Sequence, residues 1–135
     1  WIVGFPGETV EDFEQTVKLL EEIRFQNSYV FKYSPRPGTD AAALADDVPE
    51  EEKKRRNQVL LETQDGISIE KNRTRIGKRL DVLVEGPSKT NARRQTGRTD
   101  THQVVNFEAG RDLRGSFVEV DITAAGPHSL TGTMA

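Results

Sequence analysis

The sequence contains no cysteine, so this chain forms no disulfide and offers neither a thiolate nucleophile nor a thiolate ligand for an iron–sulfur cluster. Long apolar runs are also missing, since none approaches the roughly 20 residues that a membrane-spanning helix needs. No basic segment precedes the first apolar run, so we expect no secretory signal peptide. Only two histidines are present, without clustered acids, and they give no sign of a metal site. Together these absences favour a cytoplasmic protein without a membrane partner.

Charge is divided unevenly along the 135 residues, whose net charge is −3. Residues 1–70 hold 8 Lys and Arg against 15 Asp and Glu, a net of −7. Residues 71–135 hold 11 against 7, a net of +4. An acidic half joined to a basic half indicates two domains, 1–70 and 71–135, of which the second meets a polyanion. The alternative is that the basic residues only keep a small sheet in solution.

The first half reads as strand, helix, strand and helix. Apolar and β-branched residues predict strands over 1–5 and 28–34, and apolar residues at helical spacing predict a helix over 10–24. Thr9 is the expected N-cap of that helix, with Asp12 three residues on. A connecting helix is predicted over 49–70, with Gly66 a point where it could end or kink.

Strand, helix and strand at this spacing form a βαβ unit, whose strands are expected to pair in parallel. Two parallel strands and one helix cannot close a core, because parallel sheets are normally covered on both faces. The first 45 or so residues are therefore expected to belong to a larger fold. In that case the apolar residues of the two strands should leave surface without natural partners, giving disorder or contacts that form an artificial dimer. The residues concerned are Trp1, Ile2, Val3, Phe31 and Tyr33.

From residue 76 the pattern changes to alternating short strands separated by turns. The strands are predicted over 78–86, 91–99, 102–108, 115–123 and 128–135. Sixty residues can close a small five-stranded antiparallel barrel of the OB-like kind, which removes most exposed edges. Phe107 and Phe117 are expected in its core, given their apolar neighbours, while His102 is expected to cap or solvate a turn. The fold class is thus α+β, a β-α-β-α segment followed by a β-barrel.

Two stretches of the first half have the composition of a binding site. "GFPGE" (4–8) ends the first strand, and glycines there let a backbone approach a ligand at the C-terminal end of a parallel sheet. The alternative is an ordinary tight turn, and the stretch lacks the third glycine of a dinucleotide fingerprint. Arg36 in the "PRPGT" loop (35–39) could hold a carboxylate or phosphate in bidentate fashion, or it could be a surface residue of a stiff loop.

The order of the motifs is more specific than any one of them. "IVGFPGET", "FKYSPRPGT", "VPEEEKKRR", "VLVEGPSK", "GRT" and "VVNFE" follow one another as in the C-terminal part of the radical S-adenosylmethionine methylthiotransferases, which the chain resembles, most closely their tRNA-modifying MiaB type. The resemblance implies a truncated radical SAM (β/α) barrel followed by a TRAM domain, a small RNA-binding β-barrel. We therefore expect the chain to be the C-terminal piece of a larger enzyme, cut inside its catalytic domain.

The resemblance also implies a cofactor wall and a reaction. The parent would add a methylthio group to C2 of an N6-prenyladenosine beside the anticodon, using S-adenosylmethionine and two [4Fe–4S] clusters. Those clusters need cysteines that this chain lacks, so we expect the chain alone to bind no complete cofactor, to contribute no catalytic residue and to be inactive. The resemblance places the following residues at the S-adenosylmethionine site: Gly4, Phe5, Pro6, Gly7, Glu8, Ser34 and Arg36.

Basic residues of the second half are the candidates for contact with tRNA, specifically its anticodon stem-loop, because phosphate contacts supply most sequence-independent RNA affinity. They are Lys71, Arg73, Arg75, Lys78, Arg79, Lys89, Arg93, Arg94 and Arg98. "EGPSKTNARRQTGRT" (85–99), with its glycine–proline turn and four cations, is the strongest candidate, and a solvated hairpin end is the alternative. Two other functions stay open: a stand-alone RNA-binding module, and an enzyme that modifies a ribosomal protein.

Overall fold

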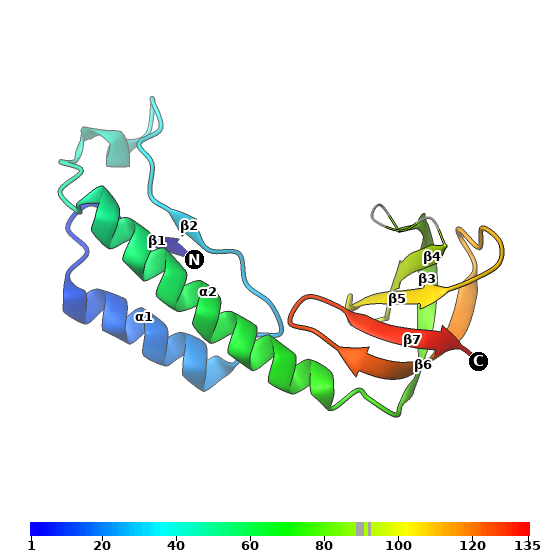
Figure 1. Ribbon diagram of the computed structural model, residues 1–135. Helices are drawn as coiled ribbons and strands as arrows, with labels where there is room; N and C mark the ends of the chain where they lie inside the picture. Colours follow the sequence, from blue (N-terminus) through cyan, green and yellow to red (C-terminus); the bar gives the residue numbers. More distant parts are fainter. Residues whose placement is uncertain (89–90, 92) are drawn as a thin grey trace. The chain divides into compact units, whose positions relative to one another are not determined.

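The structure is a computed structural model that describes residues 1–88, 91 and 93–135. The chain divides into two compact units, Trp1–Ile67 and Ser68–Ala135 (Figure 1). Each unit has its own hydrophobic core.

Unit 1 pairs two short parallel strands and packs helices against them. Its elements, the last of which continues into unit 2, are β1 (Ile2–Val3), α1 (Val10–Ile23), β2 (Phe31–Lys32), the 3-10 helix η1 (Asp40–Ala43) and α2 (Glu50–Arg73). Ile2 pairs with Phe31 and Val3 with Lys32, so the predicted parallel pairing is confirmed. The strands are shorter than the sequence predicts, because only two residues of each find a ladder partner.

Helix α1 begins at the predicted cap. The Thr9 hydroxyl accepts a hydrogen bond from the Asp12 amide at 3.1 Å, and the Asp12 carboxylate accepts one from the Thr9 amide at 2.9 Å. This reciprocal pair is a capping box, and it lowers the pKa of Asp12 below its usual value. The apolar side of the helix, with Phe13 and Leu20, packs on Val3 of β1 and Leu60 of α2.

Helix α2 runs through Gly66 to Arg73, so the helix does not end at this glycine. A β-carbon at Gly66 would meet no atom within 4 Å, and the helical hydrogen bonds on both sides outweigh the weak helix propensity of one glycine. None of the helices among the described residues has the length and apolar character needed to cross a membrane.

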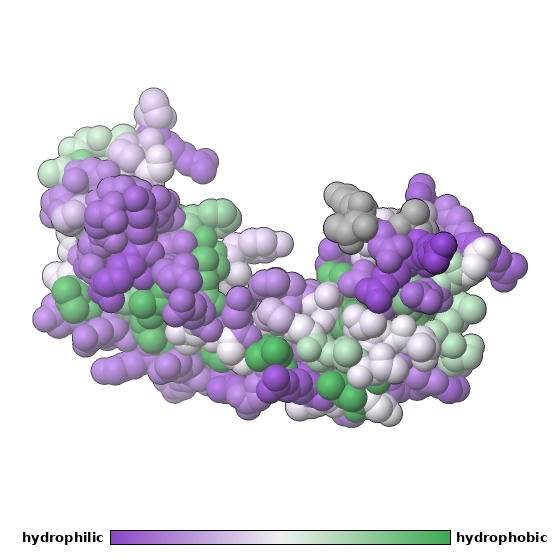
Figure 2. Space-filling view, in the orientation of Figure 1, coloured by the Kyte–Doolittle hydropathy of each residue, from purple (hydrophilic) through white to green (hydrophobic). Residues whose placement is uncertain are grey.

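The prediction of uncovered apolar surface in unit 1 is correct for some residues and wrong for one. Ile2 and Phe31 expose 61% and 59% of their surface, and Trp1 and Tyr33 are half-buried. Val3, in contrast, is fully buried, because α1 and α2 cover that side of the strand pair. Figure 2 shows hydrophobic groups reaching the surface between hydrophilic ones.

Unit 2 is a closed barrel in the order β3-β4-β5-β7-β6. The strands are β3 (Arg79–Pro87), β4 (Arg94–Arg98), β5 (Val104–Glu108), β6 (Phe117–Ala125) and β7 (Leu130–Met134). The five-stranded closure is confirmed, but the barrel is mixed and not antiparallel, since β5 and β7 pair in parallel. The reason is geometric: an odd number of strands closed in a ring cannot alternate direction throughout, so at least one neighbouring pair must be parallel.

The barrel core is formed by the inward positions of its strands. These are Val82, Val84, Val105, Phe107, Val120, Ile122 and Leu130. Gly97 on β4 also faces inward, where a β-carbon would lie 2.4 Å from the Leu83 carbonyl oxygen, so only glycine allows this close approach of the strands. The last turns of α2 belong to this unit: the amide of buried Asn72 donates to the Gly126 carbonyl at 2.8 Å and its oxygen accepts from Gln103 at 3.0 Å.

Candidate functional site

The turn after β1 has the backbone geometry that its glycines were expected to provide. Gly4 and Gly7 have φ angles of +71° and +81°, in the left-handed region that favours glycine. The Glu8 amide donates to the Phe5 carbonyl at 2.9 Å and closes the turn directly before the cap of α1. The turn therefore follows the C-terminal end of a parallel strand, where ligands of such sheets bind.

Glu8 is held inside unit 1. Its carboxylate forms an ion pair with Arg56 of α2 and accepts a hydrogen bond from the Gly4 amide at 2.9 Å. Arg56 also donates to the Glu8 carbonyl at 3.0 Å and to the Glu52 carboxylate at 2.8 Å. Only 4% of the Arg56 side chain and 12% of the Glu8 side chain are exposed, so the pair fixes the shape of the turn.

Lys53 lies three residues before Arg56 on α2, and its side chain packs against Gly4 in the loop after β1. A β-carbon at Gly4 would lie 2.3 Å from Cγ of Lys53, so the aliphatic stem of the lysine fills the space that glycine leaves. The ammonium group donates to Asp46 at 2.6 Å and to the Tyr33 carbonyl at 3.5 Å. The sequence analysis missed both buried cations. Their signal is their spacing from Leu60, because residues 53, 56 and 60 share one face of a helix.

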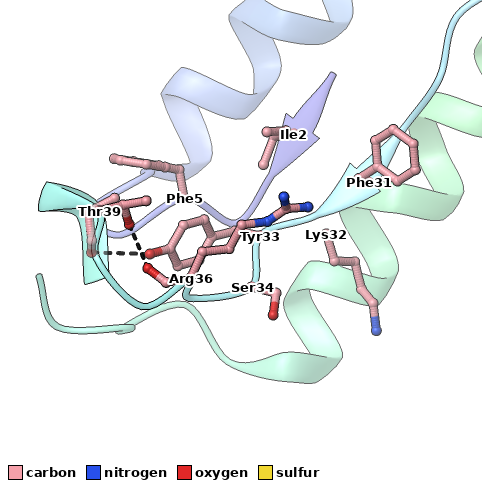
Figure 3. A pocket seen from close by; sticks show the side chains of 9 residues that line it. Ile2, Phe5, Phe31, Lys32, Tyr33, Ser34, Arg36 and Thr39 are labelled. Carbon is pink, nitrogen blue, oxygen red and sulfur yellow. Dashed lines mark hydrogen bonds between the residues drawn. The ribbon is translucent and has the colours of Figure 1, made fainter. Parts of the chain in front are cut away.

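An apolar pocket of about 350 Å³ lies where β1 and β2 end (Figure 3). Phe5 and Tyr33 meet there edge to face, with ring centroids 5.2 Å apart, and the Tyr33 hydroxyl donates to the Ala41 carbonyl at 3.1 Å. Arg36 extends its side chain past Tyr33 toward Ile2. The full lining is Ile2, Phe5, Phe31, Lys32, Tyr33, Ser34, Arg36, Thr39 and Ala41.

The residues expected at the S-adenosylmethionine site are thus divided by the structure. Phe5, Ser34 and Arg36 share the apolar pocket. Gly7 and Glu8 line a second hollow of about 310 Å³ beside Arg56. The remaining two, Gly4 and Pro6, line neither.

Seven of the expected RNA-binding cations of unit 2 fall into two groups at opposite ends of β3, and Arg98 lies between them, because it pairs with Leu83. The first group runs from the last turn of α2 to the first residue of β3: Lys71, Arg73, Arg75, Lys78 and Arg79. The second, Arg93 and Arg94, lies beside the other end, because Pro87 pairs with Gln95. A strand of nine residues spans about 30 Å, so the two groups cannot form one patch. Lys89 lies outside the described residues.

Two of the predicted cations already have acidic partners. Arg79 binds Asp121 in bidentate fashion at 2.7 and 2.8 Å, which lowers the pKa of Asp121. Arg98 donates to Glu85 at 2.9 Å. The others with no ion pair among the described residues are Arg73, Arg75, Lys78, Arg93 and Arg94. These five have the charge most available to a polyanion.

Two further cations that no local sequence pattern singles out, Arg111 and Arg114, lie in the connection 109–116 between β5 and β6. The Ala109 amide donates to the Arg93 carbonyl at 3.5 Å, and the guanidinium of Arg114 lies over Gly86 near the end of β3. The connection crosses the same barrel end as Arg93, because β6 pairs with β3 and not with β5. Knowledge of the strand order was needed to place these cations together.

Phe117 corrects a prediction. It was expected in the core, but 75% of its surface is exposed, whereas Phe107 is buried as predicted. Val118, Val120 and Ile122 point inward along β6, so the two-residue period of the strand turns Phe117 outward. His102 lies in the turn between β4 and β5 with a φ of +61°, where its amide donates to the Thr99 carbonyl at 3.0 Å.

Comparisons with known proteins agree with this architecture. Residues 73–135, which include all five barrel strands, match the TRAM domain. The chain is 56% identical over 133 residues to the tRNA-2-methylthio-N(6)-dimethylallyladenosine synthase of Acetivibrio thermocellus. It is 49% and 48% identical over 132 residues to the synthases of Cronobacter sakazakii and Escherichia coli that have the same name.

The resemblance to the methylthiotransferases is confirmed. The alignment covers 98% of this chain, so it includes the strand–turn motifs of unit 1 as well as the TRAM barrel. The chain spans 28% of the length of each of these curated relatives.

Proposed function

We propose that the chain acts as part of a tRNA methylthiotransferase, which adds a methylthio group to C2 of an N6-prenyladenosine next to the anticodon. Unit 2 holds the tRNA, and unit 1 forms part of the wall of the S-adenosylmethionine site. The observation that carries the proposal is the identity of 48 to 56% over nearly the whole chain to synthases named for this product. A cytoplasmic location, where tRNA is modified, is part of the proposal.

The pocket of unit 1 suits one face of a nucleoside cofactor. Phe5, Tyr33 and Ile2 offer apolar and aromatic surface to a flat base, while Ser34 and Arg36 offer polar groups at the edge. When bound, S-adenosylmethionine supplies the methyl group and the radical precursor. The role of this chain is to position and shield the cofactor, and Arg56 and Lys53 keep the neighbouring turn in place.

The two [4Fe–4S] clusters do not fit the residues of this chain. The sequence has no cysteine, and the described residues contain no group of metal-ligating side chains. We therefore assign no cluster ligand and no catalytic residue here, and we expect the chain alone to be inactive.

Unit 2 has the properties of an RNA-binding barrel. Five predicted cations lack acidic partners among the described residues, and Arg111 and Arg114 add to the group at the barrel end near Arg93. Each phosphate contact releases counterions, so binding should weaken steeply as salt rises. An anticodon stem-loop offers both a phosphate backbone and unpaired bases to such a surface.

The test is binding of the full chain to an anticodon stem-loop across a salt series. The unmodified protein should bind with a steep salt dependence, and the double variant Arg93→Ala/Arg94→Ala should bind more weakly with a smaller slope, by about 1 for each lost phosphate contact. The matched control is Lys18→Ala/Lys54→Ala, which removes two exposed cations of the acidic unit 1 and should change neither value. Weak binding that does not respond to salt would rule out the RNA role.

A further inference from the structure

The outward face of the barrel carries an aromatic residue that the core does not use. Phe117 begins β6, and 75% of its surface is exposed to solvent. The barrel core is filled by Phe107 and its aliphatic neighbours without it. We propose that Phe117, with Leu83 beside it, is a platform on which one unpaired RNA base stacks. The inference rests on the proposed function and deepens it, because it names a contact to a base in addition to contacts with phosphates.

The strand register places the platform in a row of four side chains. Phe117 on β6 pairs with Leu83 on β3, Leu83 pairs with Arg98 on β4, and Arg98 pairs with Val104 on β5. Directly paired residues have β-carbons about 4.5–5.5 Å apart, so neighbouring side chains of the row are in reach of one another. Leu83 is 41% exposed and extends the apolar surface of the ring toward the guanidinium of Arg98.

The size of this surface fits a base better than a protein. A stable protein interface buries about 800 Å² on each partner, whereas this apolar row offers one ring, Leu83 and the half-buried Val104. Bases stack on exposed aromatic rings on the surface of small β-folds, and every base has a suitable face. A single ring with an aliphatic neighbour therefore matches one base.

The charges around the platform indicate where the RNA backbone would run. Arg111 and Arg114 belong to the connection that leads directly into Phe117, and their charge favours a phosphate at that end of the barrel. Acidic residues lie on the other side, because Glu119 follows two positions along β6 and pairs with Asp81 on β3. Arg79 lies 3.9 Å from Glu119, but Asp81 forms no ion pair among the described residues and would repel a phosphate, so the backbone should leave the stacked base toward the connection.

Two acids lie close to the cations and limit their effect. Glu85 accepts a hydrogen bond from Arg98 at 2.9 Å, and Asp112 lies 4.0 Å from the guanidinium of Arg114. Both ion pairs are exposed to water, where an ion pair contributes little to stability. A phosphate can therefore compete with each acid for its arginine. Arg111 forms no ion pair among the described residues.

The experiment compares Phe117 variants of the full chain in binding to two RNA probes, an anticodon stem-loop and a fully paired duplex of equal length. Phe117→Ala and Phe117→Leu should both reduce affinity for the stem-loop, by about 5- to 150-fold, because both lose the aromatic face. Phe117→Trp should retain affinity. Neither loss variant should change the salt dependence or the duplex affinity, in contrast to variants of the cations.

A fluorescence measurement gives a second readout that a purely structural role would not change. The unmodified protein has one tryptophan, in unit 1, so Phe117→Trp adds a second at the platform. Its emission should be quenched by the stem-loop beyond any change seen for Trp1 alone. The control is Tyr29→Ala, which removes an aromatic residue of nearly the same exposure, 76% against 75%, from unit 1 and should leave RNA affinity unchanged.

The outcomes separate this inference from the proposed function. Salt-dependent stem-loop binding that Phe117→Ala and Phe117→Leu leave intact would overturn the platform and leave the proposed function standing. Intact RNA binding together with altered self-association would assign Phe117 to a protein contact and also overturn it. Absence of RNA binding by the unmodified protein would overturn both. The melting temperature of each variant should match that of the unmodified protein, since Phe117 lies outside the core.

Discussion

Arg56 in α2 holds Glu8, which lies 48 residues earlier in the chain, through both its carboxylate and its backbone carbonyl. The two residues belong to a helix and to the turn after β1, so the pair joins the acidic start of α2 to the turn whose Phe5 lines the candidate cofactor pocket. Both side chains are largely buried, and removal of one partner would leave the other without its compensating charge.

Arg56→Met should therefore lower the free energy of unfolding of unit 1 by about 3 kcal/mol, in the range found when one partner of a buried pair is removed. The single tryptophan, which packs edge to face on Phe25, makes unfolding of unit 1 visible by fluorescence during denaturant titration. The double variant Arg56→Met/Glu8→Gln should lose less than the sum of the two single variants. Additive losses would show that the two side chains do not interact.

Gly4 is expected to tolerate substitution less well than Gly7, although both have positive φ. Alanine at either position carries the backbone strain of about 1 kcal/mol or more. At Gly4 the new β-carbon also lies 2.3 Å from Lys53, whereas at Gly7 it meets no atom within 4 Å. Gly4→Ala should thus be the more destabilising in the same tryptophan-monitored titration, and the difference between the two alanine variants should shrink when both are measured in a Lys53→Ala background. Equal losses at the two glycines would mean that the lysine moves aside freely.

The sequence predicted the elements better than the partners of individual side chains. The capping box at Thr9 and the five barrel strands follow from local patterns, and the structure confirms them. The outward direction of Phe117 follows from the two-residue period shared by Val118 and Val120, whereas the apolar character of Phe117 and its neighbours alone predicts burial. The burial of Lys53 and Arg56 does not follow from a local pattern, because burial of a charge depends on acids and carbonyls brought near by the tertiary fold.

The position of Arg111 and Arg114 could not be predicted for another reason. It depends on the connection 109–116 crossing the barrel end so that β6 can pair with β3, and local sequence patterns do not determine the strand order. The division of the candidate cofactor residues between two hollows could not be predicted either, because it depends on where α2 packs against the turn.

Glu52 should make the stability of unit 1 depend on pH. Hydrogen bonds from Arg55 and from Arg56 lower the pKa of its carboxyl from 4.5 to about 2. A carboxyl whose pKa is lowered on folding contributes stability above its unfolded pKa and loses that contribution as pH falls through its folded pKa. The contribution is therefore complete above pH 4.5 and disappears by about pH 2.

Glu52→Gln should destabilise unit 1 at neutral pH, and its difference from the unmodified protein should shrink as the pH falls through this window. Urea titrations at several pH values, followed by tryptophan fluorescence, measure that difference. Glu14→Gln is the control, because Glu14 is exposed on α1 and forms no ion pair within the part of the chain that the structure describes. A difference that stays constant with pH would assign the effect of Glu52 to packing.

The strand pair of unit 1 should make the isolated chain self-associate. The sheet has only two strands, β1 and β2, so each has an edge without a neighbouring strand among the described residues. Ile2 and Phe31 expose more than half of their surface on these strands and add apolar area that a second copy could cover.

Sedimentation velocity over a concentration series should show a shift from monomer toward dimer, and Ile2→Lys/Phe31→Lys should reduce that shift by placing charge on the contact. Leu19→Lys is the matched control, because Leu19 is 44% exposed but lies on α1, away from the open sheet edges. A monomer at every concentration, with one cooperative unfolding transition for both units, would contradict the expectation. The apolar strand residues would then be stable in water without a covering partner.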